Sequence, residues 1–298
     1  RLLILLYKKP TIMKKITYLL AVLLITSSSL FAQKLENSTL WKITGNDLKE
    51  ASYLFGTIHV TCDATLSDEV KNALNQTSQL VLEIDIDDPE MQSKMMSKIF
   101  MKEGKTLKDF VNDQEYTMID SLLIKNLGMS VKMMERMKPF FIGASFLSKL
   151  IDCPMQSFEL ELMKVAKSQN EEVKGLETIE DQLEVFDNIP YEDQIKDLLK
   201  SAKDNLASDK EKIKSLIEVY NSQDISRLFQ VMTKDDGATS KYMDILLDNR
   251  NKKWISNIED FAKNQPTFFG VGAGHLPGEN GVIKLLRKAG FTVTAVKQ

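Results

Sequence analysis

The chain contains only two histidines, His59 and His275, and each follows a glycine at the same offset of three residues. Both segments, "GTIH" and "GAGH", therefore have the pattern Gly-x-x-His. An imidazole can bind a metal through one ring nitrogen or transfer a proton near neutral pH. Gly56, Gly272 and Gly274 would let the backbone approach closely, or take a positive φ, where each segment turns toward a site. We therefore treat the two motifs as candidate halves of one site.

Carboxylates and an arginine would complete such a site. Glu83 lies within "QLVLEIDI", Glu177 closes "EEVKGLE", and Arg250 lies in a segment with helical periodicity. The sequence has no H-E-x-x-H or G-x-S-x-G motif, and its two cysteines are too far apart in sequence for a zinc motif. Any metal would thus need histidine and carboxylate ligands, a set that suits manganese, cobalt, iron or zinc.

The elements that must position these residues are short strands separated by long helical segments. Runs of β-branched and aromatic residues predict strands at "LWKIT", "SYLFGT", "QLVLEIDI", "EEVKGLE", "PTFFGVGAG" and "FTVTAVK". Helical periodicity predicts helices over 66–77, 89–100, 113–127, 139–151, 158–168, 179–188, most of 190–261, and 279–288, with Gly290 ending the last. This alternation favours an α/β or α+β fold, a central mixed sheet with large helical insertions, as one domain over 33–298.

The candidate residues lie at or near the ends of the predicted strands. In a parallel sheet, ligands bind beyond the carboxyl ends of the strands, so side chains there converge when the strands are neighbours. Each residue alone also has a structural explanation: a hydrogen-bonded histidine, a glutamate that caps a helix, or a carboxylate that faces solvent from an edge strand. A dinucleotide site is not favoured, because Pro277 stands where the third glycine of that motif belongs.

The N-terminal segment has the layout of a secretory signal peptide. Lys14 and Lys15 precede the apolar stretch "ITYLLAVLLI", which is followed by "TSSSLFAQ". We expect a signal peptide over 13–32 with cleavage after Ala32, and we expect residues 1–12 to be upstream read-through. The apolar stretch is too short to span a bilayer. The mature protein is expected to be exported, either to the periplasm or out of the cell.

Charge and cysteine content narrow the classes of partner. Without residues 1–32 the chain keeps 34 basic and 42 acidic residues, a formal charge of about −8. An acidic chain without a basic cluster is a poor ligand for nucleic acid or an anionic membrane.

Exported chains with an even number of cysteines often pair them. Cys62 and Cys153 are therefore expected to form a disulfide that tethers the His59 loop to the helical segments, with two buried thiols as the alternative.

Five segments, in this order, resemble the TraB/GumN family, which includes the TIKI proteases: "YLFGTIH", "LVLEID", "VKGLETIEDQL", "LLDNRNKKW" and "GVGAGHLPGENGVIKLLRKAGFTV". The resemblance covers nearly all of the mature chain, and the paired Gly-x-x-His motifs are its most specific part. It implies a fold related to erythromycin esterase and ChaN-like proteins. For TIKI members it implies a metal-dependent protease activity that uses manganese or cobalt.

The resemblance also assigns residues by position. It implies that His59 and His275 are the motif histidines and that Glu83 is the strand carboxylate. Further family positions are matched by Glu177, Gln182, Arg250, Asn251 and Trp254. The chain departs from the family at one place, since bacterial members often have an aspartate where this chain has Glu159.

These observations predict a secreted metal-dependent hydrolase that acts on peptide or protein substrates. His59, His275 and Glu83 would hold one divalent metal, which polarises the scissile carbonyl and lowers the pKa of bound water. Glu177 or the second carboxylate would be the general base. Arg250 would either stabilise the developing oxyanion or fix Glu177 by an ion pair, and we favour the ion pair.

The main alternative is a non-catalytic module that uses the same crevice to sequester a peptide, a metal or a haem. An esterase of small molecules is a weaker alternative, suggested by analogy of fold alone. The metal site would distinguish the hydrolase from the binding module, because an open coordination position favours catalysis and a closed one favours storage.

Overall fold

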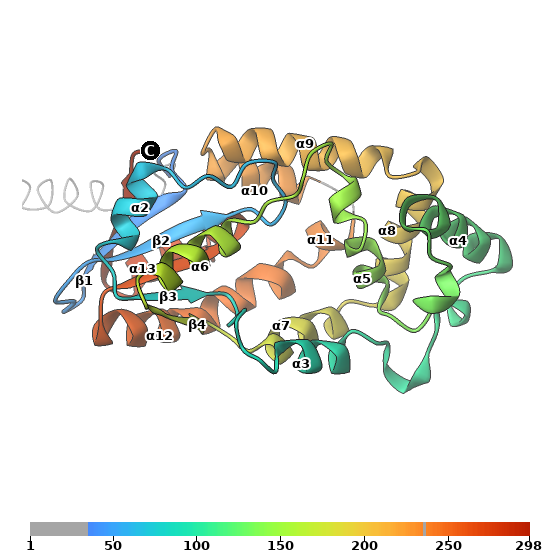
Figure 1. The fold of residues 1–298 in the computed structure, drawn as a ribbon, viewed down its shortest axis with the longest axis horizontal. Coiled ribbons are helices and arrows are strands. Elements are labelled where there is room, and N and C mark those ends of the chain that lie inside the picture. The colour runs from blue at the N-terminus through green and yellow to red at the C-terminus, as the bar shows by residue number, and fades with distance from the viewer. Residues whose placement is uncertain (1–34, 235–236) are drawn as a thin grey trace, which may run out of the picture. The chain divides into compact units, whose positions relative to one another are not determined.

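The structure, a computed structural model, describes residues 35–234 and 237–298 (Figure 1). The expected signal peptide and the segment before it lie outside these residues. The chain from Glu36 to Gln298 forms one unit. Within the described ranges, no helix is long and apolar enough to cross a bilayer.

A six-stranded mixed sheet contains all six segments that were predicted as strands, and with the helices it confirms the mixed α/β fold. The strands are β1 (Leu40–Gly45), β2 (Ser52–Thr57), β3 (Gln79–Leu82), β4 (Glu172–Gly175), β5 (Thr267–Gly272) and β6 (Phe291–Val296). They are ordered β4-β3-β5-β2-β1-β6 across the sheet. The first four in this order run parallel, whereas β1 is antiparallel to both β2 and β6.

The register of the four parallel strands aligns their carboxyl ends along one edge. Thr57 at the end of β2 lies beside Gly272 at the end of β5. Leu82 at the end of β3 pairs with Gly175 at the end of β4 on one side, and with Gly270 of β5 on the other. The segments that follow these strands therefore emerge next to one another, which is where ligand sites form in parallel sheets.

Helices cover the sheet and continue beyond its carboxyl edge (Figure 1). They are α2 (Asp68–Leu74), α3 (Met91–Lys98), α4 (Asp113–Leu127), α5 (Pro139–Ala144), α6 (Phe158–Ser168), α7 (Ile179–Glu184), α8 (Tyr191–Asp204), α9 (Ala207–Asn221), α10 (Ile225–Thr233), α11 (Ala238–Lys241), α12 (Asn249–Asn264) and α13 (Val282–Lys288). Helices α12 and α13 pack on each other and against β5 and β6.

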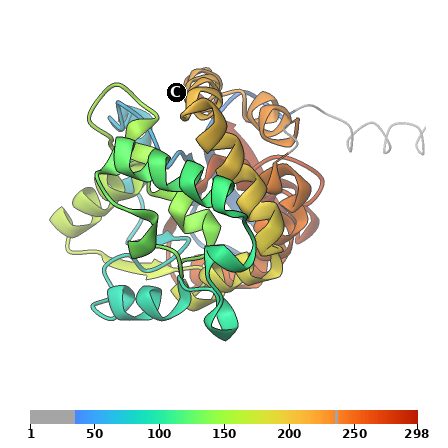
Figure 2. The same ribbon diagram turned by 90° about the vertical axis from the view of Figure 1, so that its right-hand side faces the viewer.

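Two apolar clusters stabilise these layers. The main cluster joins the sheet to α2, α6, α9 and α10, with Phe55 and Phe268 from the strands and Leu162 from α6 among its members. The second joins α4, α5 and α8, through residues such as Leu122 and Leu198. Figure 2 looks onto this helical block, with α4 in green and α8 in gold. The block therefore has a core of its own beside the carboxyl edge of the sheet.

The predicted helices differ from the observed ones mainly at their ends. The last helix begins at Val282 rather than at 279, because the chain first turns at Gly278, which has a φ of 95°. Gly290, with a φ of 97°, follows its end. The long helical segment from 190 is broken at Asn205 and Leu206, whose φ angles of 53° and 68° are incompatible with a continuous helix.

Candidate active site

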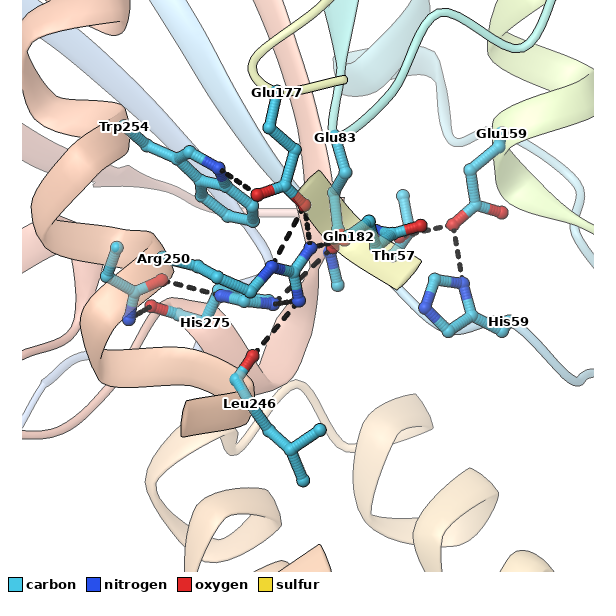
Figure 3. A network of polar contacts seen from close by, with 12 residues as sticks. Thr57, His59, Glu83, Glu159, Glu177, Gln182, Leu246, Arg250, Trp254 and His275 are labelled. Atoms are coloured by element: carbon cyan, nitrogen blue, oxygen red, sulfur yellow. Dashed lines mark hydrogen bonds and ion pairs between the residues drawn. The ribbon is translucent and has the colours of Figure 1, made fainter. Parts of the chain in front are cut away.

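Four candidate residues lie just beyond the carboxyl ends of the four parallel strands (Figure 3). His59 follows β2, Glu83 follows β3, Glu177 follows β4, and His275 lies in a 3-10 turn directly after β5. Because these strands are adjacent in the sheet, side chains that are far apart in the sequence meet at one edge.

Gly272 marks the point on which three of them converge. A Cβ atom at this position would lie 3.2 Å from Oε1 of Glu83, 3.7 Å from Cδ2 of His275 and 3.8 Å from Nε2 of His59. Both imidazoles and the carboxylate therefore border the same point, and a side chain at 272 would intrude on it. Gly56 allows the backbone of β2 to approach Leu276, since a Cβ atom added at position 56 would lie 2.6 Å from Cδ1 of Leu276.

The motif glycines thus serve close packing rather than unusual backbone angles. Gly56, Gly272 and Gly274 have no positive φ, so the expected alternative of a left-handed turn does not apply. A Cβ on Gly274 would lie 2.8 Å from the methyl group of Met232, the flexible end of a side chain on α10.

Arg250, in the first turn of α12, connects the two glutamates. Its Nη2 donates to Oε2 of Glu83 at 2.6 Å and to Oε1 of Glu177 at 2.5 Å, and its Nε donates to Oε1 of Glu177 at 2.9 Å. Its Nη1 donates to the carbonyl of Leu246 at 3.0 Å and lies 3.2 Å from Nε2 of His275. A guanidinium has five N–H donors, and each has an acceptor here. Although burial opposes its charge, the two glutamates raise the pKa of Arg250.

Glu83 is buried and ionised at the centre of the network. Its Oε1 accepts the backbone N–H of Gly272 at 2.8 Å, and its Oε2 accepts from Nε2 of Gln182 at 2.9 Å as well as from Arg250. Burial opposes the charged form, but the side chains of His275 and Arg250 outweigh this effect and hold the pKa of Glu83 below its usual value. Because His275 is neutral near pH 7, Arg250 supplies the charge that matters there.

His275 is buried, and its tautomer is fixed by Asn251. The amide nitrogen of Asn251 donates to the carbonyls of Asn280 at 2.9 Å and of His275 at 3.4 Å. Its Oδ1 therefore faces Nδ1 of His275, at 2.5 Å, so Nδ1 carries the ring proton. Nε2 keeps a lone pair that accepts from Arg250. Burial lowers the pKa of His275 to about 3, because a charged imidazole would lose its hydration.

His59 has the opposite environment, since 68% of its side chain is exposed. Its Nδ1 lies 3.0 Å from Oε1 of Glu159, and this hydrogen bond raises the pKa of His59 to about 9. Glu159 is held by Oγ1 of Thr57 at 2.7 Å and Oγ of Ser157 at 2.6 Å. Burial opposes ionisation of Glu159, but its hydrogen bond with His59 lowers its pKa. In the metal-free protein the pair is therefore charged at neutral pH.

Glu177 and Trp254 form the opposite wall of the site. Oε2 of Glu177 accepts from Nε1 of Trp254 at 3.1 Å. Burial raises the pKa of Glu177 in spite of its ion pair with Arg250. The indole ring lies 4.8 Å from the Arg250 guanidinium and 4.4 Å from the ring of His275. These contacts fix the arginine and the buried imidazole against a rigid aromatic surface.

Part of the donor set suits a divalent metal. Nε2 of His275 and Oε1 of Glu83 are 3.6 Å apart, a separation open to two ligands that each lie about 2.0–2.2 Å from one ion. His59 directs Nε2 toward the same point. Among the residues that the structure describes, however, no group of three or more His, Cys, Asp or Glu side chains has metal-binding geometry as it stands. A metal would require Nε2 of His59 to move closer to the other two atoms and Arg250 to release Nε2 of His275.

Two cavities border the network. One, of about 460 Å³, is lined by Glu177, Arg250 and Trp254 together with Lys253. The other, of about 480 Å³, is lined by residues of α5, α8 and α9 and also by Leu246, whose carbonyl holds Arg250. Each is large enough to take part of a ligand.

A disulfide joins Cys62 to Cys153, with their Cα atoms 5.6 Å apart. The same two segments pair through Thr61 and Gln156, where the N–H of Gln156 donates to the carbonyl of Thr61 at 2.9 Å. The loop after His59 is therefore attached to the segment that leads into α6.

No role for Glu159 or for Thr57 was predicted from the sequence. Glu159 had two signals: the family resemblance, in which bacterial members often have an aspartate there, and its place in the first turn of a helix, two residues after the N-cap Ser157. The packing of that turn against the end of β2 depends on contacts distant in sequence. Gln182 and Trp254, which the sequence matched by family position alone, contact the carboxylates of the network.

The fold and the site define an α/β protein in which two parallel strands each lead into a Gly-x-x-His segment beside a network of glutamates and one arginine. The chain belongs to the TraB/PrgY/gumN family, which it matches over residues 39–295.

Its relatives include proteins named as metalloproteases. The metalloprotease TIKI homolog of Amphimedon queenslandica is 21% identical, with 87% of this chain and 61% of that protein covered. Metalloprotease TIKI2 of Danio rerio is 21% identical, with 88% and 61% covered. Metalloprotease TIKI1 of Homo sapiens is 22% identical, with 86% and 61% covered. The chain thus spans about three fifths of the length of these relatives.

Proposed function

We propose that the protein is a metal-dependent hydrolase that cleaves peptide bonds. The observation that carries the proposal is the convergence of His59, His275 and Glu83 on one point beside Gly272. Relatives named as metalloproteases support the same class of activity.

In this proposal Nε2 of His275, Oε1 of Glu83 and Nε2 of His59 hold one divalent metal. The first two atoms are already at a separation that suits a ligand pair, and Nε2 of His59 borders the same point beside Gly272. The family resemblance favours manganese or cobalt, and the donor types also suit zinc or iron. When bound, such an ion supplies Lewis-acid polarisation of a carbonyl and activation of water.

Glu177 is the proposed general base, and Arg250 positions it. Glu177 borders the cavity of about 460 Å³, and burial raises its pKa, which makes it a better proton acceptor than an exposed glutamate. All N–H groups of Arg250 have acceptors within the protein. We therefore assign Arg250 to holding Glu83 and Glu177 rather than to binding an oxyanion.

A peptide or protein is the proposed substrate. It would lie across the exposed edge of His59, with parts of the substrate in the two flanking cavities.

We also propose that the protein is exported. Intact-mass measurement of the exported protein would show an N-terminus within a few residues of Gln33, and a chain that retains Met13 would contradict export by the proposed signal peptide.

A peptide-library digest tests the activity. Purified protein is incubated with the library with and without Mn²⁺, and His275→Ala serves as the inactive variant. We expect cleavage that depends on the metal and disappears in the variant. Cleavage that is equal in the variant, or that survives chelation, would contradict the proposal.

A binding module is the second candidate, and Arg250 is the observation that favours it. Its Nη1 already occupies the lone pair of His275, so this proposed ligand atom has a partner without a metal. Glu83→Gln tests the role of this carboxylate, and turnover separates the two functions. If Glu83 is a ligand, the variant loses metal; if it acts as a base, the variant keeps metal and loses rate. Metal or peptide binding without any turnover would favour the module.

A further inference from the structure

The two imidazoles of the site are held in the same way. In each ring Nδ1 faces an oxygen acceptor, Oδ1 of Asn251 for His275 and Oε1 of Glu159 for His59. In each ring the Nε2 side then faces Glu83, directly for His275 at 3.6 Å and across Gly272 for His59. Fixing Nδ1 in order to aim Nε2 is what a partner of a metal-ligating histidine does.

Glu159 is itself anchored, although His59 is exposed. The carboxylate accepts hydroxyl groups from Thr57 in β2 and Ser157 at the start of α6. An exposed imidazole has little packing to limit its rotamers, so this carboxylate is the main restraint on the ring of His59 among the described contacts.

Three successive contacts hold the loop after His59 beside the segment that leads into α6. The first is the pair His59–Glu159, the second is the backbone hydrogen bond between Thr61 and Gln156, and the third is the Cys62–Cys153 disulfide. The side chain of Gln156 adds a further contact, as its Oε1 accepts the N–H of Ala64 at 3.0 Å. The disulfide is three residues from His59 and six from Glu159 along the chain, close enough to control their separation.

We propose that Glu159 is the positioning residue of His59, and that the Cys62–Cys153 disulfide holds Glu159 and His59 in register. This inference rests on the proposed function, because it concerns the orientation of one proposed metal ligand. It adds Glu159 and the disulfide to the machinery of the site and makes metal binding sensitive to reduction of the protein.

Substitutions at Glu159 test the first half of the proposal. Glu159→Ala removes the acceptor, and Glu159→Asp keeps a carboxylate. Glu161→Gln is the matched control, since Glu161 lies on the same helix and pairs with Lys164 instead. Two quantities are measured: the ring-nitrogen chemical shifts of His59 in the metal-free protein, and the Kd for Mn²⁺ by calorimetry. The first is accessible because the chain has only two histidines.

We expect Glu159→Ala to move the Nδ1 shift of His59 toward that of an unbonded imidazole and to weaken Mn²⁺ binding about 10- to 100-fold. Glu159→Asp should recover part of both effects, and Glu161→Gln should change neither. Unchanged Nδ1 shifts in Glu159→Ala would overturn the proposal, and so would changed shifts with unchanged affinity for Mn²⁺.

A double-mutant cycle tests the role of the disulfide. Cys62→Ala/Cys153→Ala is combined with Glu159→Ala, and folding of each variant is checked by circular dichroism. We expect the cysteine substitutions to weaken Mn²⁺ binding several-fold in the wild-type background but to have little further effect in the Glu159→Ala background. Equal effects in both backgrounds would show that the disulfide acts independently of Glu159. If the cysteine variant fails to fold, the same cycle is run on the intact chain with and without reductant.

The two levels of the proposal fail differently. If the wild-type protein binds no Mn²⁺ and cleaves no peptide, the proposed function is wrong. The ring-nitrogen shifts of metal-free His59 then still decide whether Glu159 fixes the imidazole, because they do not depend on metal.

Discussion

At the scale of residues, the two imidazoles illustrate how burial and the partner at Nδ1 together set the charge of a histidine. Asn251 offers a neutral amide oxygen to the buried ring of His275, and burial then keeps that ring neutral. Glu159 offers a carboxylate to the exposed ring of His59, and the hydrogen bond keeps it protonated. The pKa of one histidine is therefore raised and the pKa of the other is lowered within the same site.

A pH titration of the metal-free protein by NMR should resolve this difference. We expect His59 to titrate near pH 9 and His275 to stay neutral until the pH falls to about 3. A protein without a histidine tag shows only these two rings. Two titrations near the ordinary value of 6.5 would contradict the assigned contacts.

The sign of the effect on stability follows from the same shifts. Because the pKa of His59 is raised in the folded state, its contribution to the free energy of unfolding is complete below about pH 6.5. That contribution is lost as the pH rises through about 9. Because the pKa of His275 is lowered, its contribution is present above about pH 6.5 and is lost as the pH falls toward about 3.

Asn251→Ala should damage both stability and the site. The substitution leaves the N–H at Nδ1 of His275 buried without an acceptor, so we expect the free energy of unfolding to fall by about 1–3 kcal/mol. We also expect affinity for Mn²⁺ to fall about 10- to 100-fold, because the tautomer is no longer fixed. Urea denaturation and calorimetry measure the two effects.

The control for this variant is Asn264→Ala, at the exposed end of the same helix. It should change the free energy of unfolding by no more than about 0.5 kcal/mol and leave the site intact. If Asn251→Ala behaves like its control, then Asn251 does not set the tautomer of His275.

At the scale of elements, the site is built by the ends of strands and by one irregular turn. Four parallel strands deliver His59, Glu83, Glu177 and His275. Arg250 comes from a helix, since it lies in the first turn of α12. A π-helical turn over Asp244–Asp248 precedes that helix, and its Leu246 carbonyl accepts from the guanidinium. Single π-helical turns of this kind are frequent at functional sites.

Gly272→Ala tests the close approach at the end of β5. Its Cβ would lie 3.2 Å from Oε1 of Glu83, so the carboxylate must shift away from the N–H that it accepts. We expect metal affinity to fall at least about 10-fold and stability to fall by about 1–3 kcal/mol from overpacking. Thermal denaturation and Mn²⁺ calorimetry provide the measurements.

Gly143→Ala is the matched control for that variant. Gly143 lies in α5 with nothing within 4 Å of its Cβ position. The substitution should stabilise the protein by up to about 1 kcal/mol and leave metal binding unchanged, because alanine favours the helix. A Gly272→Ala protein with wild-type affinity would show that Glu83 does not need its present position.

At the scale of the whole molecule, the sequence predicted which segments form strands but not their order. Short runs such as "SYLFGT" are visible because β-branched and aromatic residues cluster there. The placement of β3 between β4 and β5 depends on contacts distant in sequence. The pairing of Glu159 with His59 was not predicted for the same reason, since it requires α6 to pack beside the end of β2.

The disulfide affects the molecule as a whole, because it joins residues 91 positions apart. In the chain-entropy description, closing a loop of this size stabilises the folded state by about 4–5 kcal/mol. We expect the free energy of unfolding to fall by about that amount when the protein is reduced, measured by urea denaturation with and without reductant. The Cys62→Ala/Cys153→Ala protein should show no further change with reductant. An unchanged midpoint on reduction of the wild-type protein would contradict the cross-link.

The central claim is that His59, His275 and Glu83 hold one divalent metal. Anomalous X-ray scattering at the manganese edge, on crystals grown with Mn²⁺, tests it most directly. We predict a single manganese ion bound by Nε2 of both histidines and by Oε1 of Glu83, with Nδ1 of His59 still paired with Glu159 and Nη1 of Arg250 withdrawn from His275. A peak elsewhere, or no peak with Arg250 still donating to His275, would contradict the claim.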